Sequence, residues 1–394
     1  MWNSGTGEDE VKFHLMQTGV IGRRHELEEG MAGQRPELYQ RYLQEVKGYV
    51  QLADELGYAS YCSPEHHLQI EGFEITNHPG MWGLFVGSHA KRMAAGILGY
   101  VLPTHNPVRV AEEIATLDHM LQGRLIVGFT RGYHARWVDA YAAVRGIGAT
   151  NVAHAKAKND QDAVNREIFE ESVQVVKKAW ENSMFSHKGK YWEYPPEGGS
   201  AGHPAYAEFG QGMDENGIVR EIGIAPRPFQ TPHPKIYGAF AYSMRTVDMW
   251  AREGGKQVVF ATDLDFCDAL WNRYAESAAK AGREVPREDI GAWGGFLILT
   301  DSREQAQQLE AEHRWFWDKW FIPHGQQFPN VLIGTADDIS RQIAQAHDRL
   351  GFNECFLMFG QGHLEPGRNN DELARFAEEV APRFATKDKA GTLA

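Results

Sequence analysis

The chain has 394 residues, a length that a single α/β barrel commonly reaches, and its 42% hydrophobic content allows a large core. The formal net charge of −13 argues against nucleic acid as a partner, because phosphate backbones are bound by clustered basic surfaces. Cys62, Cys267 and Cys355 are too widely separated for a disulfide framework or a metal-ligand motif, which favours a reducing compartment.

The amino terminus is polar and acidic and shows neither the basic start nor the apolar core of a signal peptide. No later stretch is apolar over the length that a bilayer requires. We therefore expect a cytoplasmic protein with no membrane partner.

The first two strands are predicted at residues 12–16 and 58–62, with an amphipathic helix between them. Directly after the second strand comes the sequence Glu65-His66-His67. Taken alone, these residues allow a metal fragment, a general acid–base pair or an ordinary polar turn. We expect no metal, because adjacent histidines seldom reach one ion and no third ligand has the spacing of a zinc motif.

The next predicted unit is a strand, a helix and a second strand. Residues 93–102 are almost uninterrupted in apolar and small residues, as in a parallel strand covered on both faces. Asn106 and Pro107 suit an N-cap and a first helical position. Residues 125–129 predict the following strand, and Arg131 comes almost at once after it. An arginine at the carboxyl end of a barrel strand is a candidate phosphate ligand.

Eight strands alternating with helices are predicted, because strands resume at 235–238, 257–261, 294–299 and 354–358. This alternation is the signature of a (β/α)8 TIM barrel. We expect one domain over residues 1–394, with an irregular Gly- and Pro-rich insertion at about 186–234 near the carboxyl-terminal face. Long loops of this kind usually serve function, but a passive surface excursion is equally compatible with the sequence.

A close resemblance to a known family lies in residues 101–133, which read VLPTHNPVRVAEEIATLDHMLQGRLIVGFTRGY. This run resembles the corresponding segment of the luciferase-like flavin-dependent monooxygenases, and of the bacterial luciferase α subunit in particular. The likeness extends from the first strand to the last strand and helix, and it fails only in the insertion. It implies a TIM barrel that binds FMN at the carboxyl ends of its strands.

The resemblance also assigns the catalytic residues. In the family, the same Glu-His-His follows the second strand, and its first histidine lies beside the flavin and supports the oxygen chemistry. It implies that His66 is catalytic, with Glu65 and His67 as supports.

Cofactor-binding residues follow from the same likeness. The family holds the FMN phosphate with the arginine after the fourth strand, matched by Arg131, and with a Ser and a Thr at a helix start, matched by Ser243 and Thr246. General barrel logic points instead to the loop at 360–362. A simple N-cap is the plainer interpretation of Ser243.

Two further positions lie beside the flavin in the family. Its non-prolyl cis peptide in the third strand is matched by Leu98–Gly99, although a packing glycine would also explain Gly99. Thr130 stands where the luciferase α subunit has a cysteine. Trp137 stands where that subunit has an acidic residue, so light emission is not expected.

The implied function is a two-component monooxygenase. Reduced FMN from a separate flavin reductase would react with O2 to give a peroxyflavin, which oxygenates an apolar organic substrate by hydroxylation or Baeyer–Villiger insertion. The resemblance also implies a dimer, which we expect to be a homodimer. The alternatives are a deazaflavin-dependent hydride-transfer oxidoreductase and a non-catalytic flavin-binding subunit, and a metal hydrolase is the weakest.

Overall fold

The computed structural model describes residues 10–143, 160–200, 203–240, 242–324, 329–360 and 362–385. Two compact units make up the chain. The barrel unit holds residues 1–100, 124–128 and 236–394, and the second unit holds residues 101–123 and 129–235. The expected single domain over the whole chain stays a prediction.

Eight parallel strands close the barrel, since β11 pairs with β1 and β8 pairs with β9, so that the ring has no free edge. This closure confirms the predicted (β/α)8 fold. In order around the ring the strands are β1 (Lys12–Met16), β2 (Ser60–Ser63), β3 (Ala94–Val101), β4 (Leu125–Thr130), β7 (Lys235–Ala239), β8 (Lys256–Val259), β9 (Gly291–Leu299) and β11 (Glu354–Met358).

Several details of the sheet differ from the sequence prediction. Strand β2 is Ser60–Ser63 rather than 58–62, and β8 is Lys256–Val259 rather than 257–261. Strand β9 begins at Gly291, three residues before the predicted start, because its first residues pair with β8. A further short strand, β10 (Val331–Gly334), pairs in parallel with the end of β9. Its burial alternates along four residues, a pattern too short to recognise in the sequence.

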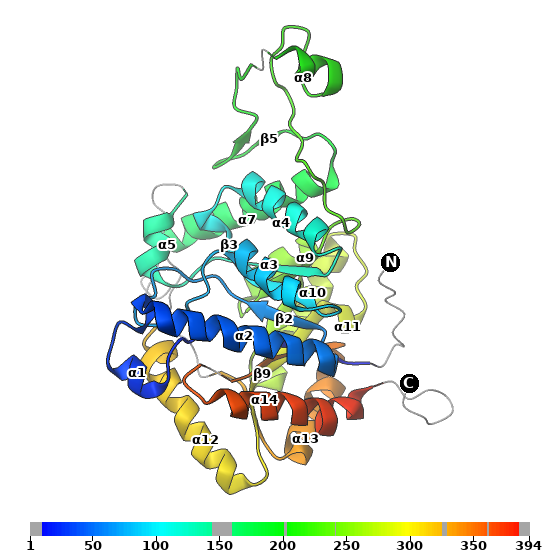
Figure 1. The fold of residues 1–394 in the computed structure, drawn as a ribbon. Helices are drawn as coiled ribbons and strands as arrows, with labels where there is room; N and C mark the ends of the chain where they lie inside the picture. The colour runs from blue at the N-terminus through cyan, green and yellow to red at the C-terminus, as the bar shows by residue number, and fades with distance from the viewer. Residues whose placement is uncertain are drawn as a thin grey trace. The chain divides into compact units, whose positions relative to one another are not determined.

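Amphipathic helices cover the outside of the barrel unit, and α2 and α14 run side by side (Figure 1). The apolar face predicted for α2 is buried as expected, at positions that include Leu38, Tyr42, Val46 and Val50. The helices of this unit are α1 (Arg24–Glu28), α2 (Pro36–Leu56), α3 (Pro79–His89), α9 (Met244–Glu253), α10 (Leu264–Lys280), α11 (Arg287–Ile290), α12 (Arg303–Phe316), α13 (Ala336–Leu350) and α14 (Pro366–Arg375).

A buried polar network lies at the amino-terminal ends of the strands. Lys256 Nζ lies 3.2 Å from Glu354 Oε2, and the Tyr237 hydroxyl donates to the same carboxylate at 3.1 Å. His14 Nδ1 lies 2.7 Å from the Ser60 hydroxyl. Because charged and polar side chains fill this end of the barrel, an apolar or flavin ligand fits the opposite, carboxyl-terminal end.

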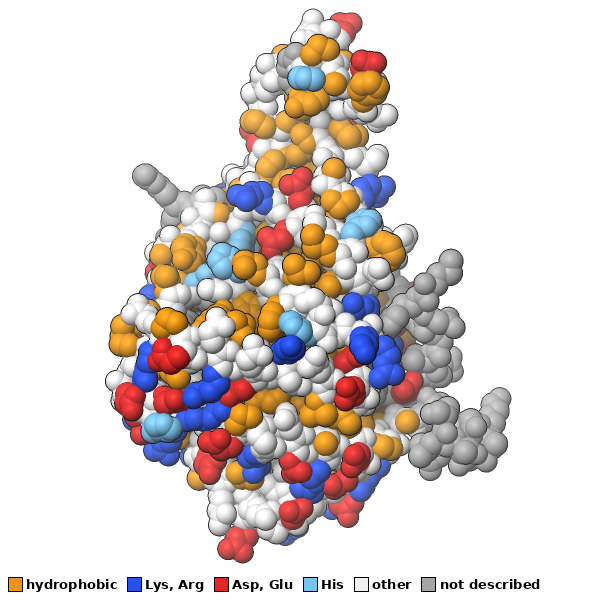
Figure 2. Space-filling model, viewed as in Figure 1, with side chains coloured by type: hydrophobic (Ala, Val, Ile, Leu, Met, Phe, Trp, Pro, Cys, Tyr) orange, Lys and Arg blue, Asp and Glu red, His pale blue; other side chains and the backbone are white. Residues whose placement is uncertain are grey.

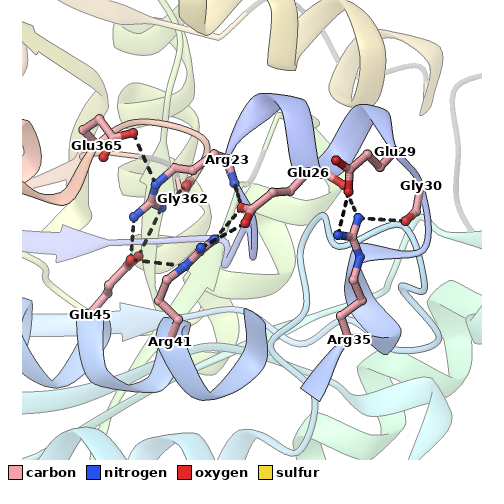
Figure 3. Close-up of polar contacts among 9 residues, drawn as sticks. All are labelled: Arg23, Glu26, Glu29, Gly30, Arg35, Arg41, Glu45, Gly362 and Glu365. Carbon is pink, nitrogen blue, oxygen red and sulfur yellow. Dashed lines mark hydrogen bonds and ion pairs between the residues drawn. The ribbon is translucent and has the colours of Figure 1, made fainter. Parts of the chain in front are cut away.

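Figure 3 shows how the loops after β1 and β11 are tied together. Arg23 lies 2.5 Å from Glu45 on α2, and it donates at 2.6 Å to the carbonyl of Gly362. A Cβ at position 362 would lie 1.6 Å from the Val20 carbonyl oxygen, so only glycine allows this approach. The loops that follow two neighbouring strands are therefore held at a defined position.

The second unit is built on α4 (Pro107–Met120) and α7 (Asp160–Glu181), which pack together and share a hydrogen bond from the Trp180 indole to the Ala111 carbonyl. It also holds α5 (Ala135–Tyr141). The predicted N-cap is confirmed, because the Asn106 side chain accepts from two backbone N–H groups. None of the helices in the described ranges is both long and apolar enough to cross a membrane.

The insertion predicted at about 186–234 is largely irregular in its described residues, 186–200 and 203–234. It contains the short hairpin of β5 (His187–Lys188) and β6 (Glu193–Tyr194) and the single-turn helix α8 (Pro204–Phe209). Hydrophobic side chains reach the surface around α8, where Phe209 is 81% exposed (Figure 2).

Candidate active site

The Glu65-His66-His67 sequence forms part of two acid–imidazole contacts just after β2. Glu65 Oε1 lies 2.9 Å from His67 Nε2. His66 Nε2 lies 3.8 Å from Oε1 of a third acid, Glu74. Glu65, His66 and Glu74 are all buried, with 2%, 6% and 1% of their surface exposed. Buried imidazoles beside carboxylates can hold and transfer protons away from bulk water.

Glu74 was missed by the sequence analysis. It lies in an irregular loop, and its second oxygen, Oε2, accepts a hydrogen bond at 2.8 Å from the indole of Trp320. These two residues are far apart in the sequence, and neither belongs to a motif. Only the folded chain brings them together.

The Leu98–Gly99 peptide bond in β3 is cis, as the resemblance implies. Leu98 is 1% exposed and belongs to the buried apolar cluster of the barrel unit, which also contains Phe73 and Trp320. The part of β3 assigned to the flavin and the loop that carries Glu74 therefore contribute to the same cluster.

Ser243 is the N-cap of α9, so the plainer interpretation of this residue is confirmed. Its Oγ accepts from the backbone N–H of Thr246 at 3.3 Å and lies 2.8 Å from the Thr246 hydroxyl. Ser243 is exposed. An exposed helix start with two hydroxyls also suits a phosphate, since N–H groups and the helix dipole favour an anion there. Capping and phosphate binding are therefore compatible roles.

Thr130 and Arg131 lie at the end of β4 and directly after it, and both belong to the second unit. The Arg131 guanidinium forms an ion pair with Asp162 on α7, with Nη1 and Oδ1 2.9 Å apart. Asn165 donates to the Arg131 carbonyl at 3.1 Å. These contacts hold the arginine in one orientation and place an acid where a phosphate would compete.

In the alternative loop at 360–362, the carbonyl groups of the two described glycines are engaged in hydrogen bonds. Gln17 donates to the Gly360 carbonyl at 2.6 Å, and Arg23 occupies the Gly362 carbonyl. Gln361 lies outside the described residues.

Taken separately, these groups have the chemistry that a flavin mononucleotide needs: the hydroxyl-bearing start of α9 in the barrel unit and the Arg131 guanidinium in the second unit are each of a kind that binds phosphate, and the buried His66 imidazole is of a kind that transfers protons. A closed (β/α)8 barrel with such groups after its strands defines an enzyme of the α/β-barrel class. More particularly, the chain belongs to the luciferase-like monooxygenase family, whose model matches residues 16–330. It is therefore an oxidoreductase of the monooxygenase kind.

Curated relatives agree with this assignment. The chain is 25% identical to 3,6-diketocamphane 1,6-monooxygenase of Pseudomonas putida, over 79% of this chain and 78% of the relative. It is 35% identical to limonene 1,2-monooxygenase of Rhodococcus erythropolis, over 85% and 80% of the two chains.

Two solved structures share the fold. The oxygenating constituent of the Pseudomonas putida 3,6-diketocamphane monooxygenase, a type II Baeyer–Villiger enzyme in complex with FMN, superimposes with a TM-score of 0.70 at 19% identity, over 95% of this chain and 99% of that one. An F420-dependent secondary alcohol dehydrogenase in complex with an F420-acetone adduct superimposes with a TM-score of 0.62 at 14% sequence identity. The match covers 94% of this chain and 98% of that one.

Proposed function

We propose that this protein is the oxygenase component of a two-component monooxygenase that uses reduced FMN and O2 to oxygenate an apolar organic substrate. A separate flavin reductase in the cytoplasm supplies the reduced FMN. The observation that carries the proposal is the buried His66 imidazole beside an acid, directly after β2, in a chain of the luciferase-like family. Two relatives are named for limonene and for 3,6-diketocamphane, and these names support a compact apolar substrate.

Reduced FMN, when bound, supplies the electrons that activate O2. In this proposal Arg131, Ser243 and Thr246 bind the phosphate, because a guanidinium and a helix start are the strongest anion ligands of the assigned set. The backbone at Leu98–Gly99 and the side chain of Thr130 would contact the flavin ring, as the family resemblance implies.

The protein's own residues control protons and water. His66 holds a proton for the reacting centre, and the Glu65–His67 pair, with its 2.9 Å contact, supports the segment that carries His66. Burial of Glu65 and His66 limits access of bulk water, which would otherwise promote wasteful loss of hydrogen peroxide.

One observation favours a second candidate function. The fold is shared with an F420-dependent dehydrogenase, so a deazaflavin-dependent hydride transfer is possible on the same barrel. Competitive binding of FMN and F420, each in its reduced form, tests the choice. Preference for FMN together with O2 consumption supports the monooxygenase. Preference for F420 without O2 consumption supports the dehydrogenase.

The proposed assembly is a homodimer. Light scattering on the purified protein measures the molar mass, and a value near twice the 44.4 kDa of one chain is expected. A mass of one chain at micromolar concentration would contradict the dimer.

A further inference from the structure

Glu74 stands out as a buried acid that none of the assigned roles uses. It is 1% exposed and lies beside the aromatic pair of Phe73 and Trp320, whose ring centroids are 4.9 Å apart and nearly parallel. An ionised carboxylate in such surroundings is costly unless polar groups satisfy it.

The two carboxylate oxygens of Glu74 face different partners. Oε2 accepts the hydrogen bond from the Trp320 indole at 2.8 Å, and Oε1 lies 3.8 Å from Nε2 of His66. The indole hydrogen bond fixes one oxygen, and this leaves the other directed at the imidazole. Trp320 is therefore one of the groups that orient the Glu74 carboxylate.

The backbone around Glu74 holds the same arrangement. Its φ angle is +50°, a left-handed conformation that is uncommon for residues other than glycine. On the following residues, Ile75 donates its N–H to the Gly19 carbonyl at 2.9 Å, and the Thr76 carbonyl accepts from the backbone N–H of His66 at 2.8 Å. The loop is thus bound both to the chain after β1 and to His66 itself.

We propose that Glu74, held by Trp320, is the positioning residue for His66: it keeps a proton on Nε2 and fixes the orientation of the imidazole. A negative charge within 4 Å stabilises a proton on the nitrogen that faces it. The same logic applies to the acid that orients the histidine of a catalytic triad. This inference rests on the proposed role of His66. The second acid, Glu65, lies at hydrogen-bond distance from His67, so the two acids serve different imidazoles.

The test is nitrogen NMR of the full-length, flavin-free protein with 15N-labelled histidine, in which the His66 signals are assigned by their loss in His66→Gln. We expect Nε2 of His66 to carry the proton in the unchanged protein. In Glu74→Gln the charge is lost while the shape is kept, so the Nε2 signal should move toward that of an unprotonated nitrogen. Trp320→Phe keeps an aromatic ring beside Phe73 and removes the indole donor, so it should cause a smaller shift in the same direction.

Glu65→Gln is the matched control: it removes a carboxylate charge beside His67, so it should change the signals of His67 strongly and those of His66 much less than Glu74→Gln does. His66 signals that are unchanged in both Glu74→Gln and Trp320→Phe would overturn the proposal, and so would an equal response of His66 to Glu65→Gln. If Glu74→Gln does not fold, the shift in Trp320→Phe decides alone. The NMR experiment contains no flavin, so unchanged His66 signals would leave the monooxygenase proposal standing. If the monooxygenase proposal fails instead, the shift of the His66 signals in Glu74→Gln can still be measured.

Discussion

The His66 imidazole is the side chain whose removal separates cofactor binding from chemistry. His66→Ala should leave the affinity for FMN nearly unchanged, because the residues assigned to the phosphate are elsewhere in the chain. The oxygen-derived flavin species should decay at least about tenfold faster, since a positioned acid–base group contributes roughly 10²–10⁴-fold to such steps. Stopped-flow absorbance after mixing with O2 measures the decay. An unchanged lifetime and an unchanged product yield would rule out the role of His66.

A second prediction concerns the ion pair of Arg131 and Asp162 and the affinity of the protein for FMN. Arg131→Ala should weaken FMN binding by roughly 10–100-fold, because a charge-assisted hydrogen bond contributes about 1.5–3 kcal/mol. Asp162→Asn should strengthen it, since the guanidinium loses its 2.9 Å anionic partner. Fluorescence titration with FMN measures both. Arg220, which pairs with Asp214 in the same unit, provides the control: Arg220→Ala should not change the affinity. Equal affinities for all three variants would contradict the phosphate assignment.

Single residues were predictable from the sequence where the signal is local. Ser243 precedes a helix pattern and is its N-cap, and Asn106 is likewise an N-cap. Glu74 was not predictable, because its partner Trp320 lies 246 residues away and its backbone conformation is set by tertiary contacts. Arg131 was a candidate anion ligand from its place after a strand, the roles of Thr130 and Thr246 came from the resemblance, and all three remain proposals.

At the scale of elements, α14 carries an acid whose ionisation opposes folding. Burial raises the pKa of Glu372 to about 7, although the backbone N–H of Leu299 donates to its carboxyl group at 2.9 Å. The folded state therefore binds more protons than the unfolded state between the ordinary glutamate pKa and about 7. Glu372 therefore contributes fully to the free energy of unfolding at low pH, where it is protonated, and this contribution is lost as the pH rises from the ordinary glutamate pKa to about 7.

Glu372→Gln keeps an oxygen that can accept from Leu299 and removes this titration. Relative to the unchanged protein, the variant should gain stability as the pH rises from about 4.5 to 7, by roughly 1–3 kcal/mol. Thermal unfolding at pH 5 and pH 8 measures the difference. A stability difference that is the same at both pH values would contradict the raised pKa.

Strand and helix prediction worked best where the hydrophobic pattern was long. The apolar runs at β1 and β11 gave their exact bounds, and the apolar face of α2 is the buried one. The early start of β9 was missed because the strand begins at a glycine, Gly291, which resembles a loop residue. In the fold, a Cβ at Gly291 would lie 2.5 Å from the Trp271 ring of α10, so this glycine permits close packing of the strand against the helix.

At the scale of the whole molecule, the polar network at the amino-terminal end of the barrel links residues from β7, β8 and β11. Lys256 is 3% exposed, and its ammonium lies 3.2 Å from Glu354. Glu354→Ala should lower the free energy of unfolding by about 3–5 kcal/mol, because it removes the carboxylate from a buried charge. The exposed pair of Arg24 and Glu28 gives the comparison, and Glu28→Ala should cost at most about 1 kcal/mol. Chemical denaturation measures the free energy of unfolding of both variants. An equal loss in Glu354→Ala and Glu28→Ala would contradict the claim that the buried network stabilises the fold.

The fold as a whole could be read from the sequence because eight strands alternate with helices, and this alternation has one common solution in a closed barrel. The insertion could be located by its composition, but its few elements could not be predicted, since its short hairpin and α8 have no repeated hydrophobic pattern.

The central claim is that the protein activates O2 with reduced FMN. The most direct measurement is rapid mixing of the anaerobic protein, carrying reduced FMN, with oxygenated buffer while the flavin spectrum is followed. We expect a spectrum that differs from both reduced and oxidised FMN and persists longer than any transient of free FMN, and His66→Ala should shorten it. Reoxidation that matches free FMN in rate and spectrum, together with tighter binding of F420 than of FMN, would contradict the monooxygenase.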